Sequence, residues 1–511
     1  MSPVSLGRRA LTLRVDADLW KRLRAFHLRE GKRSEALSYV WARCERVLGG
    51  HVVLMPAGAP FLALDADCYE RHGSAQVCLR PDVLNGMLVE FARSDFNCLV
   101  NVHDHWFAED ADFSGVDDTD DLAFDRYLRE RFEPMLKRRP ELGPARDIFN
   151  LSIVLGRSGC TARMIDIRRS QPFTKARQIA LLGDRWSSAA VTGQRSALAP
   201  AGDWLSRHAG FLDGATQMAL QELHVAVVGC GGLGSILAES LARAGIGALT
   251  LIDGDRIEPS NLNRWQGGLP QDIGRSKANV LAERTRAMFP HCRVRAVARP
   301  LEHLRSLPAL AAADIILAGL DNDEARYVLN HLALQHLQPY FDLGVAITTT
   351  PRVDFSGRYF AVIPGVTGCV ECKTYDLIDR EEVIRHFSHP AVTQARRAAG
   401  YVIDRPEMAT PSAYSLNQRT AALGVQELMN FLSGWRPTAT VIREQWATGA
   451  LQRADRDNYP ERPDPDCPMC SLRIGRGWSV PLPRRPVSGD LRASLALSAR
   501  VNRPAAEVGG S

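Results

Sequence analysis

The stretch that decides the fold is HVAVVGCGGLGSILAESLARAGIGALTLIDGDRIEPSNLNRWQGGLPQDIGRSK, residues 224–277. Its apolar run 225–228 is followed at once by a glycine-rich turn, and a helical pattern then covers 235–244. A second apolar run, 248–252, ends at Asp253. A strand, a tight turn, a helix and a second strand are typical of half a nucleotide-binding sheet. The pattern therefore predicts a doubly wound, mostly parallel α/β fold.

The turn after the first predicted strand contains four glycines: Gly229, Gly231, Gly232 and Gly234. Such a turn directs free backbone N–H groups toward a phosphate, and the positive end of the following helix adds to the attraction. On its own the turn favours a dinucleotide-binding enzyme, because many doubly wound proteins carry one.

Charged residues beyond the turn favour ATP over a dinucleotide. We expect Asp253 to hold the ribose hydroxyls, and Arg264 and Lys277 to neutralise the triphosphate. Asp321, which follows the predicted strand 315–317, is expected to hold Mg²⁺. Fixed charges of this kind act where negative charge moves from the attacked α-phosphorus to departing pyrophosphate. The pattern predicts an enzyme that activates a carboxylate with ATP.

These charged residues are spaced eleven, thirteen and forty-four positions apart, and Asn261 and Asn263 lie between the first two in SNLNRW. This pattern resembles the ubiquitin-activating superfamily, which includes the bacterial thiamine- and molybdopterin-pathway adenylyltransferases (the ThiF/MoeB superfamily). The resemblance covers about 203–472 and implies that both asparagines help to bind ATP. The segment WLSRH resembles the family's N-terminal arginine segment, so Arg207 is expected to reach the ATP of a partner subunit in a homodimer.

Four of the eleven cysteines form two CxxC pairs: Cys369 with Cys372, and Cys467 with Cys470. Two such pairs offer four thiolates for a closed, tetrahedral zinc site. The family resemblance implies a structural zinc at these four residues. A redox pair or a disulfide is the alternative.

The interval 373–466 contains no cysteine. Full ubiquitin-activating enzymes place their thioester-forming cysteine there, so this chain departs from that pattern. The reaction then stops at the acyl-adenylate, or a hydroxyl of Thr410, Ser412 or Ser415 takes the acyl group as an ester. A hydroxyl is a poor nucleophile without an adjacent base, so these hydroxyls are better interpreted as caps for a helix predicted over 416–432.

A second group of chemically active residues lies in FNCLVNVHDHWFAEDADFSGVDD. The run 96–102 predicts a strand, and His103 and His105 then point to the same face of an extended chain. Together with Asp117 they offer three zinc ligands and leave one position open for water, as hydrolysis requires. Glu35, ahead of another strand-like run, is the candidate general base.

This pattern resembles the JAB/JAMM metalloproteases, which cut isopeptide bonds after ubiquitin-like proteins, over about 20–182. The resemblance implies a catalytic zinc and gives Ser114 a role in holding the oxyanion. Ser114 is equally a candidate helix N-cap with Asp117 at the third helical position. Trp106 stands where the family has proline, and Asp118 is a substitute for the carboxylate ligand. The alternative is a domain without catalysis that serves only for docking.

The chain has 511 residues, of which 45% are hydrophobic and 24% charged, so a soluble enzyme of two or three domains is expected. The net charge of +5 is spread along the chain and gives no argument for nucleic acid. No apolar run predicts a membrane span or a signal core, and we expect a cytoplasmic protein. The predicted parts are a metalloprotease-like domain at 1–185, a linker at 186–202, an adenylation domain at 203–474 and a disordered tail at 475–511.

One site is expected to activate a protein's C-terminus, and the other to break bonds made from that same C-terminus. A ubiquitin-like protein with a glycine C-terminus is the common substrate that satisfies both. A conjugating enzyme is then the expected acceptor, in a bacterial conjugation system. The alternative is a sulfur-carrier adenylyltransferase whose partner is a sulfurtransferase.

Overall fold

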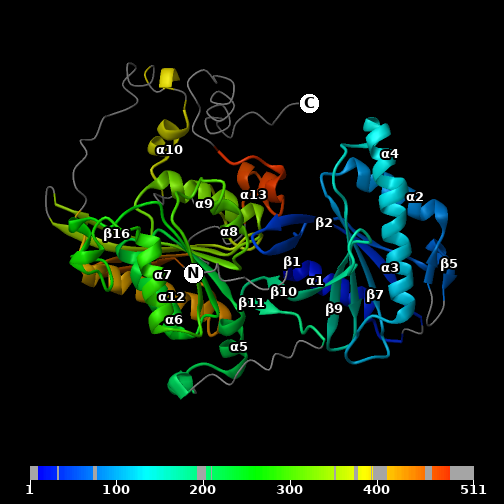
Figure 1. The fold of residues 1–511 in the computed structure, drawn as a ribbon, viewed down its shortest axis with the longest axis horizontal. Helices are drawn as coiled ribbons and strands as arrows, with labels where there is room; N and C mark the ends of the chain where they lie inside the picture. The colour runs from blue at the N-terminus through cyan, green and yellow to red at the C-terminus, as the bar shows by residue number, and fades with distance from the viewer. Residues whose placement is uncertain are drawn as a thin grey trace.

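The computed structural model consists of two α/β lobes that lie side by side (Figure 1). The first lobe is built from residues 10–192 and the second from residues 203–483, within the part of the chain that is described. The described residues are 10–31, 34–72, 77–192, 203–208, 210–349, 353–372, 378–388, 390–392, 394, 411–454 and 463–483. None of the helices in these ranges is long and apolar enough to span a membrane.

The first lobe consists, in chain order, of β1 (Ala10–Asp16), α1 (Ala17–His27), β2 (Leu37–Val47), β3 (Gly50–Met55), β4 (Phe61–Ala63), β5 (Tyr69–His72), β6 (Val77–Leu79), α2 (Pro81–Arg93), β7 (Cys98–Asp104), α3 (Gly115–Tyr127), a π-helical turn (Leu128–Phe132), α4 (Glu133–Arg138), β8 (Phe149–Leu155), β9 (Cys160–Ile165), β10 (Phe173–Leu182) and β11 (Trp186–Ser188).

The large sheet of the first lobe has the strand order β1-β3-β2-β7-β8-β9-β10-β11, with β4 attached to β2. β1 also pairs with β10, so the pairing returns to the strand from which it starts. Both faces of β7 are covered: Val100 packs in the inner core, whereas Leu99 packs beneath α2 and the π-helical turn. This burial on both faces explains why β7 begins with an unbroken apolar run, residues 98–100. His103 shares the Leu99 face, because side chains alternate along a strand.

The second lobe consists of a 3-10 helix (Asp203–His208), α5 (Gly214–Glu222), β12 (His224–Val228), α6 (Gly232–Ala244), β13 (Ala248–Ile252), two short 3-10 helices (Pro259–Asn261 and Pro270–Asp272), α7 (Lys277–Met288), β14 (Arg293–Val297), α8 (Ser306–Ala311), β15 (Ile315–Ala318), α9 (Asp323–Gln335), β16 (Tyr340–Thr348), β17 (Asp354–Val362), α10 (Arg380–Phe387), α12 (Tyr414–Ser433), β18 (Val441–Gln445), β19 (Ala450–Ala454), α13 (Pro468–Arg473) and a last 3-10 helix (Gly477–Ser479).

The eight-stranded sheet of this lobe has the order β14-β13-β12-β15-β16-β17-β18-β19. The strands from β14 to β16 are parallel, and those from β17 onward extend the sheet antiparallel. Val225 and Val227 pack in one core with α6 and α12, whereas Ala226 and Val228 pack in another with α9. The predicted strands and the parallel sheet are confirmed. Helix α6 begins at Gly232, inside the glycine turn, three positions before the predicted start at Ser235.

A buried cation joins the two lobes. The Arg14 side chain of β1 is fully buried, and its Nη1 donates to the carbonyl oxygen of His336, at 2.8 Å. Its Nη2 donates to the carbonyls of Ala311 (3.0 Å) and Ala313. These carbonyls lie at the ends of α8 and α9, where the helix dipoles favour a positive charge. The lobes also share apolar core, since Leu54 of β3 belongs to the same cluster as Val225.

Two of the predicted domain boundaries differ from the structure. The predicted linker begins with strand β11, and Trp186 is buried because its ring packs in the core shared by both lobes. The predicted tail begins with an ordered segment: the Trp478 N–H donates to Glu45 of β2 (3.0 Å), and its ring lies against that of His336. The remainder of these two segments, 193–202 and 484–511, lies outside the described residues.

We expect Arg14→Met to destabilise both lobes together, by on the order of 2–5 kcal/mol, because it removes the Arg14 donor from the buried carbonyls of His336 and Ala311, whereas the carbonyl of Ala313 also accepts from Gln338. Urea unfolding followed by fluorescence measures the effect. Lys21→Met is the control, because Lys21 is exposed and forms an ion pair with nearby Asp18. Equal stability of the two variants would contradict a structural role for the buried guanidinium.

Candidate functional site

The glycine turn after β12 is shaped by two close backbone approaches. Gly229 has a φ of +83°, and a Cβ there would lie 2.7 Å from the carbonyl oxygen of Gly319. A Cβ on Gly234 would lie 1.7 Å from the carbonyl oxygen of Gly229, so α6 packs directly onto the turn. Glycine is required at both positions, because no side chain fits. As a result the N-terminus of α6 opens into the space above the sheet.

A cavity of about 1180 Å³ occupies that space, at the carboxyl ends of the parallel strands. β12 lies here between β13 and β15, which the chain reaches in opposite directions, and open α/β sheets bind ligands at such a switch point. The predicted ATP-site residues that line the cavity are Gly229, Gly231, Gly232, Asp253, Asn261, Arg264, Lys277 and Asp321.

Asp253 at the end of β13 connects the cavity to the glycine turn. Its Oδ2 accepts a hydrogen bond from the Cys230 N–H (2.6 Å), and its Oδ1 accepts one from the Asp255 N–H (2.7 Å). Burial raises the pKa of Asp253, although both backbone hydrogen bonds oppose this shift. Each carboxylate oxygen keeps a further lone pair that can accept a hydrogen bond from a hydroxyl group.

The two predicted triphosphate-binding cations already have protein partners. Arg264 Nη1 donates to the Ser260 carbonyl (2.6 Å), and Lys277 Nζ lies 2.9 Å from Asp255 Oδ2. The Lys277 side chain is only 12% exposed, whereas Asp255 is 72% exposed, so the pair lies at the cavity wall. These contacts hold both cations in place at the cavity before a ligand arrives.

Three predicted ATP-site residues do not line the cavity. Gly234 contributes the close packing of α6 onto the turn. Asn263 is exposed and donates to the carbonyl of Ser412 (3.2 Å), which ties its loop to the segment before α12. Arg207 lies exposed in the first 3-10 helix, so its predicted contact with a partner subunit's ATP stays a prediction.

Other lining residues come from elements that the sequence pattern did not connect with the site. Asn417 of α12 approaches the turn so closely that a Cβ on Gly232 would lie 2.3 Å from its Nδ2. Arg326 of α9 pairs with Asp323 (2.6 Å) and with Asp342 of β16 (3.1 Å). A single arginine or asparagine on a helix forms no recognisable sequence motif. Arg326 and Asn417 are therefore identified as cavity residues only by their position in the fold.

The hydroxyls interpreted as helix caps do not cap α12. Its N-cap is Ala413, which makes no side-chain capping bond, and Ser415 lies inside the helix. Ser412 instead lines the cavity, and its Oγ accepts from Asn417 Nδ2 (3.4 Å). The capping interpretation is therefore wrong for Ser412 and Ser415, while Thr410 lies outside the described residues.

The two CxxC pairs converge in a buried cluster where the segment after β17 meets α13. Cys369 Sγ lies 3.8 Å from Cys372 Sγ and 3.7 Å from Cys467 Sγ, and Cys372 Sγ lies 3.5 Å from Cys470 Sγ. Tetrahedral Zn–S bonds of about 2.3 Å require sulfur separations of about 3.8 Å, whereas a disulfide requires about 2.0 Å. All four sulfur atoms lie within 4.8 Å of one another, so the cluster fits zinc and does not fit a disulfide.

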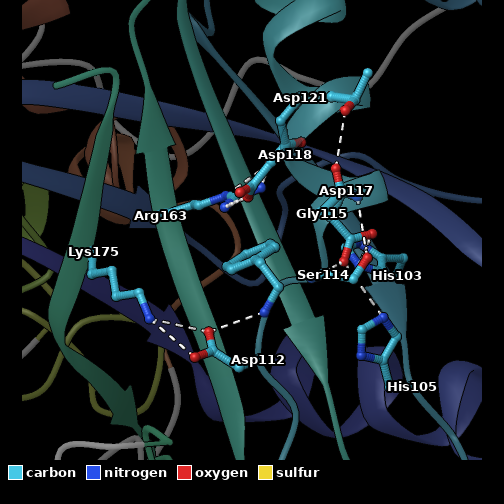
Figure 2. Close-up of polar contacts among 12 residues, drawn as sticks. His103, His105, Asp112, Ser114, Gly115, Asp117, Asp118, Asp121, Arg163 and Lys175 are labelled. Atoms are coloured by element: carbon cyan, nitrogen blue, oxygen red, sulfur yellow. Dashed lines mark hydrogen bonds and ion pairs between the residues drawn. The ribbon is translucent and has the colours of Figure 1, made fainter. Parts of the chain in front are cut away.

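His103, His105 and Asp117 form a second group that fits a metal ion, on the first lobe (Figure 2). His103 Nε2 lies 3.2 Å from Asp117 Oδ1, and His105 Nε2 lies 3.6 Å from Asp117 Oδ2. His103 Nε2 is buried and faces the Asp117 carboxylate, so both side chains direct a possible ligand atom to the same place. Burial lowers the pKa of His103, but the adjacent Asp117 outweighs it and the net pKa is raised.

Ser114 and Asp117 form a capping box at the start of α3, as the sequence predicted. The Ser114 N–H donates to Asp117 Oδ2 (2.6 Å), and the Asp117 N–H donates to Ser114 Oγ (3.3 Å). Both oxygens of Asp117 therefore face defined partners, and the carboxylate is held toward the histidines. Asp118, the predicted substitute, turns away and pairs with Arg163.

Glu35 lies just before β2, whose Leu37 is the register partner of His103 on β7. It is close enough for its charge to contribute to the raised pKa of His103. Behind the centre, Asp104 accepts hydrogen bonds from buried His27 (2.8 Å) and from the Ala36 N–H (3.1 Å). These bonds fix the backbone between His103 and His105 relative to Ala36, which follows Glu35 and precedes β2.

In comparison with known proteins, the model of the ThiF family matches residues 205–469, a little more than half of the chain. The tRNA threonylcarbamoyladenosine dehydratase of Escherichia coli strain K12 is 46% identical over 97 residues, which are 18% of this chain and 36% of that protein. The Nedd8-activating enzyme E1 catalytic subunit of Drosophila melanogaster is 36% identical over 165 residues, 30% of this chain and 35% of that protein.

A third relative is the sulfur carrier protein adenylyltransferase of Thermus thermophilus, which is 36% identical over 118 residues. The match covers 23% of this chain and 44% of that protein. The chain thus matches less than half of the length of each of these three relatives.

We expect Cys372→Ser to remove one zinc ion per chain and to lower the melting temperature, because the four thiolates tie together segments that are 98 positions apart. Elemental analysis and thermal unfolding measure the two effects. Cys78→Ser is the matched control, since Cys78 is an exposed free cysteine. Unchanged zinc content in Cys372→Ser would contradict the assignment.

Proposed function

Because the chain belongs to the ThiF family, we propose that it is an adenylyltransferase that uses MgATP to activate the C-terminal carboxylate of a ubiquitin-like protein. The proposal rests above all on one observation. Asp253, Arg264, Lys277 and Asp321 come from four separate segments and line a single cavity beside the glycine turn. A dinucleotide-binding enzyme has no need for two cations and a further carboxylate around its phosphates.

In the proposed reaction a carboxylate oxygen of the substrate attacks the α-phosphorus of ATP. The bond from the α-phosphorus to the bridging oxygen breaks, pyrophosphate leaves with the electron pair, and an acyl-adenylate remains. Arg264 and Lys277 are positioned to neutralise the leaving phosphates, and Asp321 would hold Mg²⁺. Such fixed groups accelerate the reaction because they need no rearrangement as the charge moves.

The size of the cavity supports a macromolecular substrate that reaches ATP through its terminal residues. Its lining continues from the glycine turn past Gly344 of β16 and Gly357 of β17 to Arg443 and Gln445 of β18. The cavity therefore extends beyond the predicted ATP-site residues, and we propose that the tail of the substrate binds in this extension. A conjugating enzyme is the proposed acceptor, with AMP as the leaving group of the second step, in a bacterial conjugation system.

We also propose that the first lobe is a zinc hydrolase that removes or trims the same ubiquitin-like tail. A zinc ion held by His103, His105 and Asp117 would supply Lewis-acid chemistry to a bound water. Glu35 is the candidate to take a proton at this site. Ser114, whose Oγ accepts the capping bond from the Asp117 N–H, is the candidate to stabilise an oxyanion.

A homodimer is proposed from the surface around Arg207. Trp204, three positions earlier, is 46% exposed, and Phe211, four positions later, is 50% exposed. Trp435 at the end of α12 contacts Phe211, with ring centroids 5.0 Å apart, and is itself 46% exposed. Exposed aromatic groups of this kind often mark a contact with another protein chain. A second copy would cover them and bring its Arg207 toward this cavity.

A sulfur-carrier adenylyltransferase is the second candidate function, and the Thermus thermophilus relative favours it. The adenylation step is the same in both, but the acyl group passes to a sulfurtransferase in place of a conjugating enzyme. The first lobe would then serve for docking, and one zinc ion per chain is expected in place of two. The acceptor that discharges the adenylate distinguishes the two functions.

We expect Asp321→Ala to lower pyrophosphate release by on the order of 100-fold, because it removes the proposed Mg²⁺ ligand from the transition state. The assay contains ATP, Mg²⁺ and a purified ubiquitin-like protein with a glycine C-terminus. His105→Ala, in the other lobe, is expected to release pyrophosphate at the wild-type rate. Equal losses in both variants would be inconsistent with two independent sites.

Intact mass spectrometry of the same reaction tests the fate of the acyl-adenylate. The free enzyme is expected to carry no covalent acyl group, because the neighbour of the Ser412 hydroxyl is the amide of Asn417, which cannot act as a base. A mass increase that survives thiols and is lost in Ser412→Ala would instead show that Ser412 takes the acyl group as an ester.

For the first lobe, we expect cleavage of an isopeptide-linked ubiquitin-like protein to be lost in His105→Ala, which lacks a metal ligand. Glu35→Gln should keep the metal but lose on the order of 100-fold or more in turnover, because the amide cannot accept the proton. Metal content and cleavage rate are measured on the same samples. Wild-type cleavage by Glu35→Gln would exclude Glu35 as the base, and a metal-free, inactive wild-type lobe would favour docking.

A further inference from the structure

We propose that Arg163 is a positioning residue for the metal centre of the first lobe: it fixes the start of α3 so that Asp117, and not Asp118, faces the histidines. The inference rests on the proposed metal site. Arg163 contacts none of the three metal-binding residues, and acts through the segment that carries one of them (Figure 2).

The guanidinium of Arg163 is sandwiched between two aromatic rings. Its Cζ lies 3.7 Å from the ring centroid of Phe113 and 4.0 Å from that of Phe173. Phe113 immediately precedes the N-cap Ser114, and its ring also lies 6.0 Å from that of His103. Contacts between a buried guanidinium and aromatic rings are strong because water does not compete. Arg163 therefore anchors the residue that leads into α3.

The edge of the same guanidinium binds the first turns of α3. Arg163 Nε and Nη2 both donate to Asp121 Oδ2, at 2.9 and 2.7 Å, and Nη1 donates to Asp118 Oδ1. The Arg163 side chain is only 4% exposed and that of Asp121 only 7%, so solvent screens the pair weakly. The guanidinium thus holds Phe113 before Asp117 and both Asp118 and Asp121 after it. These contacts fix the rotation of α3 about its axis.

The sheet places Arg163 at a fixed position relative to His103. Arg163 on β9 is the register partner of Ser152 on β8, which is the register partner of Asn101 on β7. Asn101 lies two positions before His103, and side chains two positions apart share a face of the strand. The cation therefore stands on the same face as His103, two strands away, at a separation set by backbone hydrogen bonds.

The aspartate pairing also explains the choice between Asp117 and Asp118. A metal ion prefers whichever carboxylate can reach it, and Asp118 is adjacent in the helix. Adjacent residues of a helix point about 100° apart, so Asp118 points in a different direction from Asp117. The hydrogen bond from Arg163 holds the Asp118 carboxylate in that direction, away from the histidines. Without Arg163, both Asp118 and Asp121 lose their cation, and α3 can rotate or Asp118 can compete for the metal.

The test uses the full chain with zinc first bound at the four cysteines and Co²⁺ then added to the remaining site. Its visible absorption reports on affinity and coordination geometry. We expect Arg163→Met to bind Co²⁺ on the order of 10- to 100-fold more weakly than wild type and with a shifted spectrum, as changes to groups that orient metal ligands do. Arg163→Lys, which keeps the charge but loses the planar fork, should give an intermediate loss.

Lys175→Met is the matched control. Lys175 on β10 is the register partner of Arg163, and its substitution by Met removes the same charge as Arg163→Met. Lys175, however, forms an exposed ion pair with Asp112. It should bind Co²⁺ with wild-type affinity and spectrum. The melting temperature of the metal-free variants shows whether Arg163→Met folds; if it does not, Arg163→Lys carries the test.

The outcomes separate this inference from the function on which it rests. If wild type gives no Co²⁺ signal beyond that of His105→Ala, the proposed metal site is wrong. If wild type binds Co²⁺ and the folded Arg163 variants match its affinity and spectrum, the metal site stands and the positioning role is overturned. An equal loss in Lys175→Met would also overturn it, because the effect would then be one of charge alone.

Discussion

The second lobe depends on one steric constraint: the turn after β12 passes directly beneath the turn after β15. Gly229 and Gly319 face each other at a distance that admits no side chain, and Gly234 brings α6 against the same turn. This contact lets the N-terminus of α6 open above the sheet. Because β13 and β15 end and α7 and α9 begin at the same edge of the sheet, Asp253, Lys277 and Asp321 meet around one cavity, although 68 positions separate the first from the last.

The candidate metal centre of the first lobe is also assembled from separate elements. His103 and His105, two of its candidate ligands, lie on β7 and just after it, whereas Asp117 lies on helix α3, whose orientation has to be fixed. The capping box of Ser114 and Asp117 sets the side chain, and the stacked Arg163 sets the helix. The buried Arg14 side chain and the hydrogen bond from the Trp478 N–H to Glu45 join the two lobes.

Local patterns predicted the strands β12, β13 and β15 and the α3 capping box, because each depends on residues close together in sequence. The two CxxC pairs lie 98 positions apart, and their convergence was expected from the family resemblance. Long-range packing could not be predicted in this way. Trp186 and Trp478 were assigned to a linker and a tail, because small, proline-rich neighbours conceal a tryptophan that packs in a distant core. The sequence favoured Ser412 as a helix cap, whereas in the fold it lines the cavity together with Asn417.

A crystal structure with a non-hydrolysable ATP analogue and Mg²⁺ tests the central claim most directly. We expect the ribose at Asp253, the triphosphate between the α6 N-terminus and the side chains of Arg264 and Lys277, and the metal ion at Asp321. An empty cavity at saturating analogue, or a nicotinamide dinucleotide bound there in preference to ATP, would contradict this account.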